Sequence, residues 1–299
     1  MLDELFERLE KQDRLALARL LTLVAREEQL DVIRSRAGKR PEKTRVVAIT
    51  GNAGVGKSTL VGKLAEYLRS QGQSVAILAC DPQSPLTGGA LLGDRVRMPS
   101  RPDDPGIYIR SVAAASGHQA VAEHVDVMIR VLGRYGFDVV LLETVGAGQG
   151  DTAVSELADV VVLLVQPESG DELQWEKAGL LEVADVVVVH KADLAGADRT
   201  EGQVKELLSL PGCRKIAVLR VSSTKGEGFE ALWQAVLESP RHAAAADEDA
   251  RELLRRAQEI LAERFHRQGD RVGNVIDRWK RQELDEAQAA DELLQLLAR

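Results

Sequence analysis

The octapeptide GNAGVGKS at residues 51–58 constrains the fold more than any other feature of this 299-residue chain. It matches G-x-x-x-x-G-K-[ST] and stands between a β-branched run at 46–50 and a segment with helical spacing at 57–71. In this context the glycines let backbone N–H groups surround phosphates, the lysine reaches the β- and γ-phosphates, and the serine hydroxyl ligates Mg²⁺. The alternative is an accidental glycine-rich turn, and the flanking patterns argue against it. The residues predicted to bind the phosphates are Gly51, Asn52, Ala53, Gly54, Val55, Gly56, Lys57, Ser58 and Thr59.

Short apolar runs organise the middle of the chain. Runs of this kind are typical of buried strands, and the longer stretches between them leave room for crossover helices, which favours a parallel sheet covered on both faces. The fold class is therefore α/β: a P-loop NTPase with a mostly parallel central sheet, N-terminal helices and a C-terminal helical arm. We expect three parts, at residues 1–41, 42–240 and 241–299. The predicted strands lie at residues 46–50, 75–80, 139–142, 160–165, 186–189 and 216–221.

Charge and composition exclude several classes of protein. The chain has 39 Lys and Arg against 47 Asp and Glu, a net charge of −8, which is the wrong sign for gripping a phosphate backbone, so no nucleic acid partner is expected. Cys80 and Cys213 form no CxxC pair, which argues against a disulfide framework. The acidic first residues do not resemble a targeting segment, and no apolar run reaches the roughly 18 residues that span a bilayer. We expect a cytoplasmic protein without a membrane partner.

Acidic residues follow two of the predicted strands. Asp81 comes directly after the run at 75–80, and Glu143 after the run at 139–142. Ligands of open α/β sheets bind at the carboxyl ends of the strands, where such acids can hold Mg²⁺ or its waters. A single acid there is as readily a solvated loop residue, but two beside a phosphate loop favour magnesium. The tetrapeptide from Glu143 to Gly146 resembles the D-x-x-G of GTPases, in which Gly146 would bring a backbone amide to the γ-phosphate.

The run at 186–189 is followed by a candidate base-recognition motif. His190, Lys191 and Asp193 occupy three positions of a segment similar to the N-K-x-D with which GTPases recognise guanine. An aspartate there accepts hydrogen bonds from guanine N1 and N2, whereas adenine would leave it unpaired, so GTP is predicted over ATP. His190 replaces asparagine; its N–H could still donate to guanine N7, and the alternative is a histidine satisfied within the fold. A supporting turn is predicted at Ser222, Ser223 and Thr224.

Three segments carry a family resemblance. Residues 81–98, 143–149 and 170–174 are similar to the MeaB/ArgK-type P-loop GTPases, and the resemblance extends over nearly the whole chain. Members of that family are G-protein chaperones of adenosylcobalamin-dependent acyl-CoA mutases. The resemblance implies a GTP-hydrolysing chaperone that gates cofactor loading and protects such a mutase, with the C-terminal helices forming a homodimer. It also implies switches at 82–98, 143–151 and 168–177, and Mg²⁺ surrounded by Ser58, Asp81, Asp94 and Glu143.

The predicted reaction is GTP + H₂O giving GDP and phosphate. Lys57 and Mg²⁺ would neutralise charge, and Asp81 and Asp94 are the candidates to organise Mg²⁺ and the attacking water. The phosphate loop contains no arginine, which predicts a slow intrinsic rate that a partner raises. Two other functions stay open: an ATPase or kinase linked to amino-acid transport, and a scaffold that binds nucleotide without turnover. His118 and His124 are six residues apart, which does not fit a helical metal pair.

Overall fold

The computed structural model describes residues 2–82, 104–114, 121–145, 152–167, 181–210, 214–242 and 248–297. The chain forms two compact units, Met1–His242 and Ala243–Arg299, which are described one at a time. The three N-terminal helices belong to the first unit, together with the sheet. Asp94, Gly146 and the predicted switch at 168–177 lie outside the described residues, as does most of the switch predicted at 82–98.

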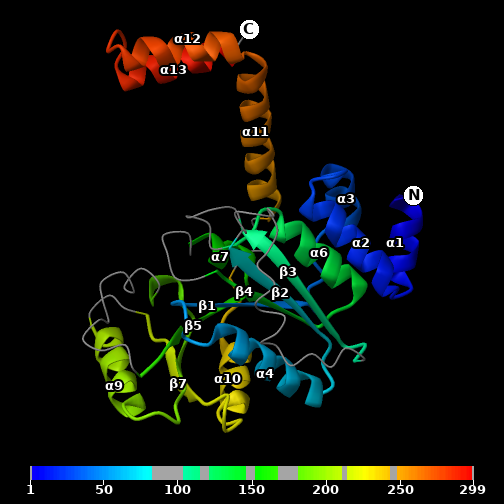
Figure 1. Cartoon of the computed structure of the whole chain (residues 1–299), viewed down its shortest axis with the longest axis vertical. Coiled ribbons are helices and arrows are strands. Elements are labelled where there is room, and N and C mark those ends of the chain that lie inside the picture. The colour runs from blue at the N-terminus through cyan, green and yellow to red at the C-terminus, as the bar shows by residue number, and fades with distance from the viewer. Residues whose placement is uncertain are drawn as a thin grey trace. The chain divides into compact units, whose positions relative to one another are not determined.

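A seven-stranded sheet forms the centre of the first unit, and all of its pairings are parallel (Figure 1). This confirms the α/β fold with a parallel sheet. The spatial order is β3-β2-β4-β1-β5-β6-β7. The strands are β1 (Arg45–Gly51), β2 (Val75–Pro82), β3 (Ile107–Ala114), β4 (Val139–Glu143), β5 (Val160–Val165), β6 (Val186–His190) and β7 (Ala217–Val221).

Two details of the sheet differ from the sequence prediction. The edge strand β3 was not predicted, because Arg110 and Ser111 interrupt its apolar residues, so no continuous apolar run marks it. The sequence also put the strands that end in Asp81 and Glu143 beside the phosphate loop. Of these, β4 is next to β1, with Glu143 paired with Ile49, whereas β4 separates β2 from β1.

Helices cover both faces of this sheet. Along β1, Val46 and Ala48 belong to one core cluster, whereas Val47 and Ile49 belong to the other, as strand alternation requires. The first cluster is built with α1 (Leu2–Glu10), α2 (Arg14–Ala25), α3 (Leu30–Ala37), α6 (Val125–Tyr135) and α7 (Thr152–Leu157). The second is built with α4 (Lys57–Ser70) and α10 (Phe229–Glu238), and α9 (Ala197–Leu208) packs on β6 and β7.

Buried charges join the N-terminal segment to the sheet. Arg40 donates two hydrogen bonds to the carboxylate of Asp159, at 2.8 and 2.6 Å, and the same carboxylate accepts from the backbone N–H of Val46 at 2.7 Å. The side chain of Asp159 is 2% exposed. Removing one partner of such a pair would leave an uncompensated buried charge, so this contact fixes residue 40 beside the start of β1.

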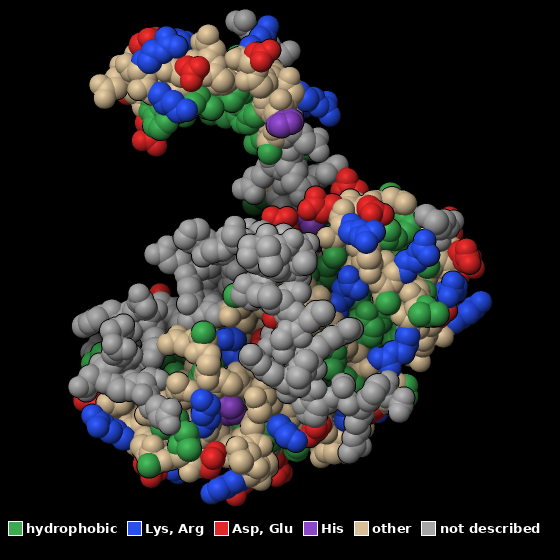
Figure 2. All heavy atoms as spheres, viewed as in Figure 1, with side chains coloured by type: hydrophobic (Ala, Val, Ile, Leu, Met, Phe, Trp, Pro, Cys, Tyr) green, Lys and Arg blue, Asp and Glu red, His purple; other side chains and the backbone are tan. Residues whose placement is uncertain are grey.

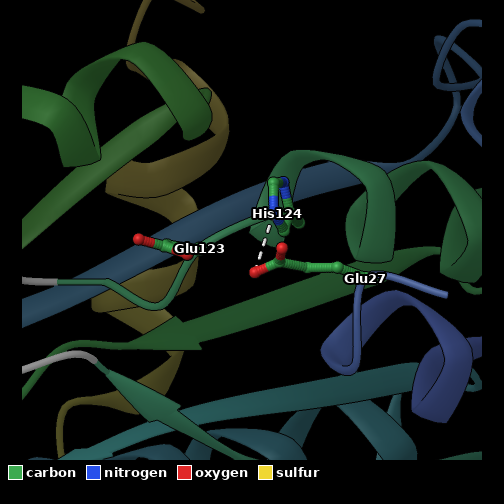
Figure 3. A group of neighbouring side chains, drawn as sticks. All are labelled: Glu27, Glu123 and His124. Atoms are coloured by element: carbon green, nitrogen blue, oxygen red, sulfur yellow. Dashed lines mark ion pairs between the residues drawn. The ribbon is translucent and has the colours of Figure 1, made fainter. Parts of the chain in front are cut away.

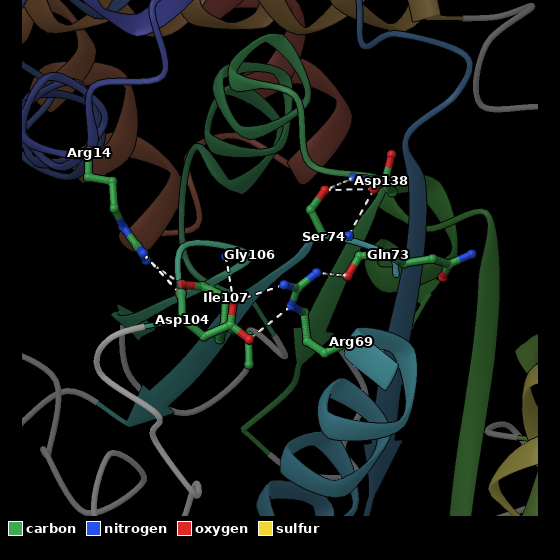
Figure 4. Close-up of polar contacts among 8 residues, drawn as sticks. All are labelled: Arg14, Arg69, Gln73, Ser74, Asp104, Gly106, Ile107 and Asp138. Carbon is green, nitrogen blue, oxygen red and sulfur yellow. Dashed lines mark hydrogen bonds and ion pairs between the residues drawn. The ribbon is translucent and has the colours of Figure 1, made fainter. Parts of the chain in front are cut away.

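A second polar cluster positions the start of β3 (Figure 4). Arg69 of α4 forms a bidentate pair with the Asp104 carboxylate, at 3.0 and 2.9 Å, and Arg14 of α2 donates to the Asp104 carbonyl at 3.1 Å and to the Ile107 carbonyl. A Cβ on Gly106 would lie 2.1 Å from the Arg69 guanidinium carbon, so a larger residue there would require the Arg69 side chain to move. Helices from both faces thus hold the edge strand that lacks a strong apolar run.

The second unit contains α11 (Glu248–Arg267), α12 (Gly269–Lys280) and α13 (Glu286–Leu297). Val275 and Ala289 are buried, and Arg278 pairs with Glu292 at 2.7 Å across α12 and α13. Several large apolar side chains of this unit are exposed: Leu253, Leu254, Ile260, Leu261, Trp279 and Leu294.

No helix in the described part of the chain is long and apolar enough to cross a membrane. On the visible face of the first unit, acidic and basic side chains are interspersed (Figure 2).

Candidate nucleotide-binding site

The phosphate loop connects β1 to α4 with a backbone that requires glycine. Gly51, Gly54 and Gly56 have φ values of +144°, +78° and +96°, a region that L side chains rarely adopt. A Cβ on Gly51 would also lie 2.6 Å from the carbonyl oxygen of Leu164. The side chain of Val55 is buried, whereas residues 52–54 are exposed. The loop therefore presents its backbone to solvent at the N-terminus of a 14-residue helix, where anions are stabilised.

Lys57 provides the positive charge of this loop. Its side chain is 8% exposed, and its Nζ atom donates to the carbonyl oxygens of Gly51 at 2.9 Å and Asn52 at 3.2 Å. The ammonium group is thus held inside the loop that would enclose the phosphates. Thr59, predicted with the phosphate-binding residues, is exposed two positions further along the helix.

Ser58 and Glu143 meet beside the loop. The Ser58 hydroxyl donates to Oε1 of Glu143 at 2.6 Å, and both side chains are buried. Asp81, at the end of β2, is also buried. A hydroxyl and two carboxylates are the hard oxygen ligands that Mg²⁺ prefers, so the donor set here fits that ion. Asp94 and Gly146, the other predicted members, are not among the described residues.

Asp193 and Ser222 contact each other in the part of the site predicted to recognise the base, residues 190–193 and 222–224, which we call the base side. The Ser222 hydroxyl donates to Oδ1 of the exposed Asp193 carboxylate at 2.5 Å, and it accepts from the backbone N–H of Lys225 at 3.1 Å. The hydrogen bond from Ser222 lowers the pKa of Asp193 below its ordinary value, so the carboxylate is charged at neutral pH. A charged acceptor in this position suits a ligand with adjacent N–H groups. Of the other turn residues, Ser223 is buried and Thr224 is exposed.

Lys191 links the base side to the phosphate side, as we call the phosphate loop with Ser58 and the acids at the ends of β2 and β4. It has a φ of +56°, and its Nζ atom donates to the Gly54 carbonyl at 3.1 Å and to Oε1 of Gln166 at 2.7 Å. Gln166 was not predicted, because nothing in its sequence surroundings marks it; it follows directly after β5, next to β6 in the sheet. The lysine side chain therefore spans from the base motif to the loop that faces the phosphates.

His190 is buried between the same two loops. Its Nδ1 lies 2.8 Å from the Val55 carbonyl and its Nε2 lies 2.8 Å from the Ser223 hydroxyl. Because a carbonyl can only accept, Nδ1 carries the proton and the Ser223 hydroxyl donates to Nε2. Burial lowers the pKa of His190 below its ordinary value, which keeps the ring neutral. Both nitrogens are used within the protein, so the predicted N–H donation to guanine N7 is not part of this arrangement.

A separate group of potential metal ligands lies at the start of α6 (Figure 3). Glu27, Glu123 and His124 each offer a ligand atom, and these atoms lie within 4.8 Å of one another. In the described part of the chain, this is the group of three or more His, Cys, Asp or Glu side chains whose ligand atoms lie that close together. Both glutamates are exposed, and His124 Nε2 faces Glu27 at 3.7 Å as an ion pair. Exposed acidic groups of this kind are common without a metal, so we assign none.

The fold and the site together define a class of protein. A parallel sheet with a glycine-rich phosphate loop after β1, a serine–carboxylate pair beside it and an aspartate after β6 are the parts of a P-loop GTPase. The family model described as Methylmalonyl Co-A mutase-associated GTPase MeaB matches residues 17–275. The chain therefore belongs to the MeaB family, which confirms the resemblance found in the sequence and the predicted GTPase class.

Individual relatives agree with this assignment. A protein of Pyrococcus horikoshii whose name contains the word GTPase is 37% identical over 309 residues, covering 98% of each chain. A protein of Nocardia farcinica named Fused isobutyryl-CoA mutase is 36% identical over 239 residues, covering 76% of this chain and 22% of its own. A solved structure titled LAO/AO transport system kinase superposes with a TM-score of 0.71 over 100% of this chain and 98% of its own; at 23% identity it is evidence for the fold alone.

Proposed function

We propose that this protein binds GTP and GDP with Mg²⁺ and couples GTP hydrolysis to the service of an adenosylcobalamin-dependent acyl-CoA mutase. In this role it gates loading of the mutase's cofactor and protects the enzyme. One observation supports the partner most strongly: a segment homologous to most of this chain occurs in the same polypeptide as an enzyme named isobutyryl-CoA mutase. A fusion of two activities in a relative is the arrangement expected when the separate proteins work as a complex.

The phosphate side would perform the hydrolysis. The backbone of residues 51–56 positions the phosphates, Lys57 neutralises their charge, and Ser58, Asp81, Asp94 and Glu143 hold Mg²⁺. When bound, Mg²⁺ neutralises charge on the β- and γ-phosphate oxygens. Gly146 provides a backbone amide to the γ-phosphate, and Asp81 and Asp94 orient the attacking water. Because the phosphate loop contains no arginine, the intrinsic rate is slow and rises when the partner binds.

The base side would select guanine. Asp193 accepts hydrogen bonds from the N1 and N2 groups, and its contact with Ser222 keeps it charged and oriented for that purpose. Lys191 packs along the base motif, while Ser223 and Thr224 complete the turn. An adenine base has no donor at N1 and no 2-amino group, so it would leave the carboxylate without its partners.

The partner is tested by hydrolysis in its presence. GTP turnover is measured with and without an equimolar purified adenosylcobalamin-dependent acyl-CoA mutase, using an adenosylcobalamin enzyme that acts on no acyl-CoA as the control. We expect complex formation with the mutase and a rise in phosphate release of tenfold or more, on the order of what one added stabilising group supplies. Absence of both binding and any change in rate would contradict the proposed function.

We also propose that the second unit forms a homodimer. Leu253 and Leu254 on α11 are 71% and 65% exposed, and Ile260 and Leu261 on the same helix are 38% exposed. Apolar side chains grouped in this way are typical of an interface. Light scattering of the protein eluting from a sizing column should give twice the chain mass, falling to a monomer in the Leu253→Glu/Leu254→Glu variant. Leu15→Glu, at an equally exposed leucine of α2, is the control and should leave the mass unchanged. A monomeric wild type would overturn this part.

A further inference from the structure

The ring of His190 is a fully enclosed polar group of the base side. It is 2% exposed, at the carboxyl end of β6. Its two nitrogens bond to segments far away in sequence: Val55 in the phosphate loop, 135 residues before it, and Ser223 in the turn after β7, 33 residues after it. The ring therefore joins the loop that faces the phosphates to the turn that faces the base.

The space around this ring is filled on the phosphate side as well. A Cβ on Gly56 would lie 2.6 Å from Cε1 and 2.7 Å from Nδ1 of His190, so the ring packs directly onto the glycine backbone. The neighbouring Lys191 makes a second bond to the same loop, at the Gly54 carbonyl. The His190–Lys191 pair thus lies against residues 54, 55 and 56 of the phosphate loop, and turning the imidazole toward a base would break both of its hydrogen bonds.

The number of donors on the side chain decides what His190 can recognise. A neutral imidazole has one N–H and one lone pair, and both are satisfied inside the protein. An asparagine at this position would have two N–H donors and a carbonyl, so it could bond to a loop carbonyl and still donate to a ligand. Protonation would not restore that capacity, because the added proton would lie on Nε2 and point at Ser223.

We propose that His190 is a positioning residue that ties the phosphate loop to the base turn, and that this site therefore recognises guanine without a hydrogen bond to N7. The N1 and N2 edge, through Asp193, then carries the selectivity. This inference rests on the proposed binding of guanine nucleotides and adds which atoms of the base are recognised. Burial has the largest effect on the pKa of the ring, lowering it and keeping the ring neutral; of the neighbouring charges, Lys191 lowers this pKa and Asp193 raises it.

The analogue 7-deaza-GTP tests this directly, because it replaces N7 by a CH group and leaves the N1 and N2 edge intact. We expect the wild-type protein to bind GTP and 7-deaza-GTP with dissociation constants within twofold of each other. In His190→Asn, whose side chain has a donor to spare, GTP should bind roughly threefold to tenfold more tightly than the analogue, the usual effect of one hydrogen bond.

The outcomes separate cleanly. A wild-type protein that binds GTP but loses threefold or more with 7-deaza-GTP would overturn the inference, and so would a folded His190→Asn variant that does not discriminate. If that variant does not fold, Ser223→Ala decides the positioning role: it should weaken GTP and 7-deaza-GTP by the same factor, and an unchanged affinity would count against it. A protein that prefers ATP to GTP would instead contradict the proposed guanine binding.

Discussion

The phosphate side and the base side of this site differ in what fixes their residues. On the phosphate side, Gly51, Gly54 and Gly56 adopt backbone angles that only glycine adopts readily, and neighbours fill the space beside two of them. On the base side, side-chain hydrogen bonds fix the residues. His190 stands where the usual motif has asparagine, and its ring bonds to the Val55 carbonyl and the Ser223 hydroxyl. A backbone constraint admits one residue type, whereas a hydrogen-bonding constraint admits any side chain with matching donors and acceptors.

The largest effect is expected at Lys57, the cation of the phosphate side. Lys57→Ala removes the charge held at the loop, and we expect GTP hydrolysis to fall about 100-fold or more, as with loss of one preorganised charge-stabilising group. Phosphate release at saturating GTP measures it. Lys63→Ala on the same helix, where a partly exposed lysine pairs with Glu66 at 2.8 Å, is the matched control and should retain the wild-type rate. Hydrolysis by Lys57→Ala within about threefold of wild type would show that the loop works without this cation. Absence of phosphate release from both the wild type and the variant would instead favour the scaffold alternative.

The next effect tests whether the two sides touch at Gly56. Alanine at Gly54 meets only backbone strain, since nothing lies within 4 Å of its Cβ, and we expect a loss of about 1 kcal/mol in the free energy of unfolding. Alanine at Gly56 meets similar strain and also the His190 ring, which should cost about 1–3 kcal/mol more. Denaturant unfolding without nucleotide measures both. Equal losses in the two variants would mean that the ring is not packed on the loop.

Below pH 6.5, the free energy of unfolding should depend on the protonation of His190. The folded-state pKa of His190 lies below the unfolded value of 6.5, so above that pH the ring is neutral in both the folded and the unfolded chain. Its contribution to the free energy of unfolding is then fully present. As the pH falls from 6.5 toward the folded-state pKa, the unfolded chain binds a proton first, and the free energy of unfolding drops by up to about 1.4 kcal/mol per pH unit. His190→Asn should flatten this part of the profile. Identical slopes from pH 6.5 to 5 in both proteins would argue against a buried neutral ring.

The smallest effect is expected at Ser222. Ser222→Ala removes the hydrogen bond that orients Asp193 and lowers its pKa, and GTP affinity should fall roughly threefold. Ser209→Ala, at an exposed serine that caps α9, is the comparison and should leave the affinity unchanged. A loss as large as that in Asp193→Asn would mean that Ser222 contributes as much to GTP binding as the aspartate does.

The sequence predicted those parts of the molecule that depend on local patterns. Continuous apolar runs identified six of the strands, and the glycine spacing identified the phosphate loop with its helix. The position of β2 beyond β4 could not be predicted, because chain order does not determine spatial order in a parallel sheet. The edge strand β3 escaped because charged contacts from Arg14 and Arg69, and not a run of apolar residues, hold its start.

The same distinction holds within the site. Asp193 was marked as a candidate by its neighbours in the sequence, and its role in base recognition stays a prediction. The partners of His190 could not, because they come from segments 135 and 33 residues away and include a backbone carbonyl that no sequence pattern reveals. Gln166 is a similar case: it belongs to the site through its bond to Lys191, 25 residues further along the chain.

The central claim is that the phosphate side binds the triphosphate and the base side selects guanine. Competition between GTP and ATP, for wild type and for Asp193→Asn, tests it most directly. The phosphate loop should hold either triphosphate, so selectivity should come from Asp193. We expect ATP to displace a fluorescent GTP analogue from wild type at least 100-fold less well than GTP does, and we expect this ratio to fall below tenfold in Asp193→Asn. Asp198→Asn, at an exposed aspartate paired with Arg220, should keep the wild-type ratio. Equal displacement by ATP and GTP from the wild-type protein would contradict the account.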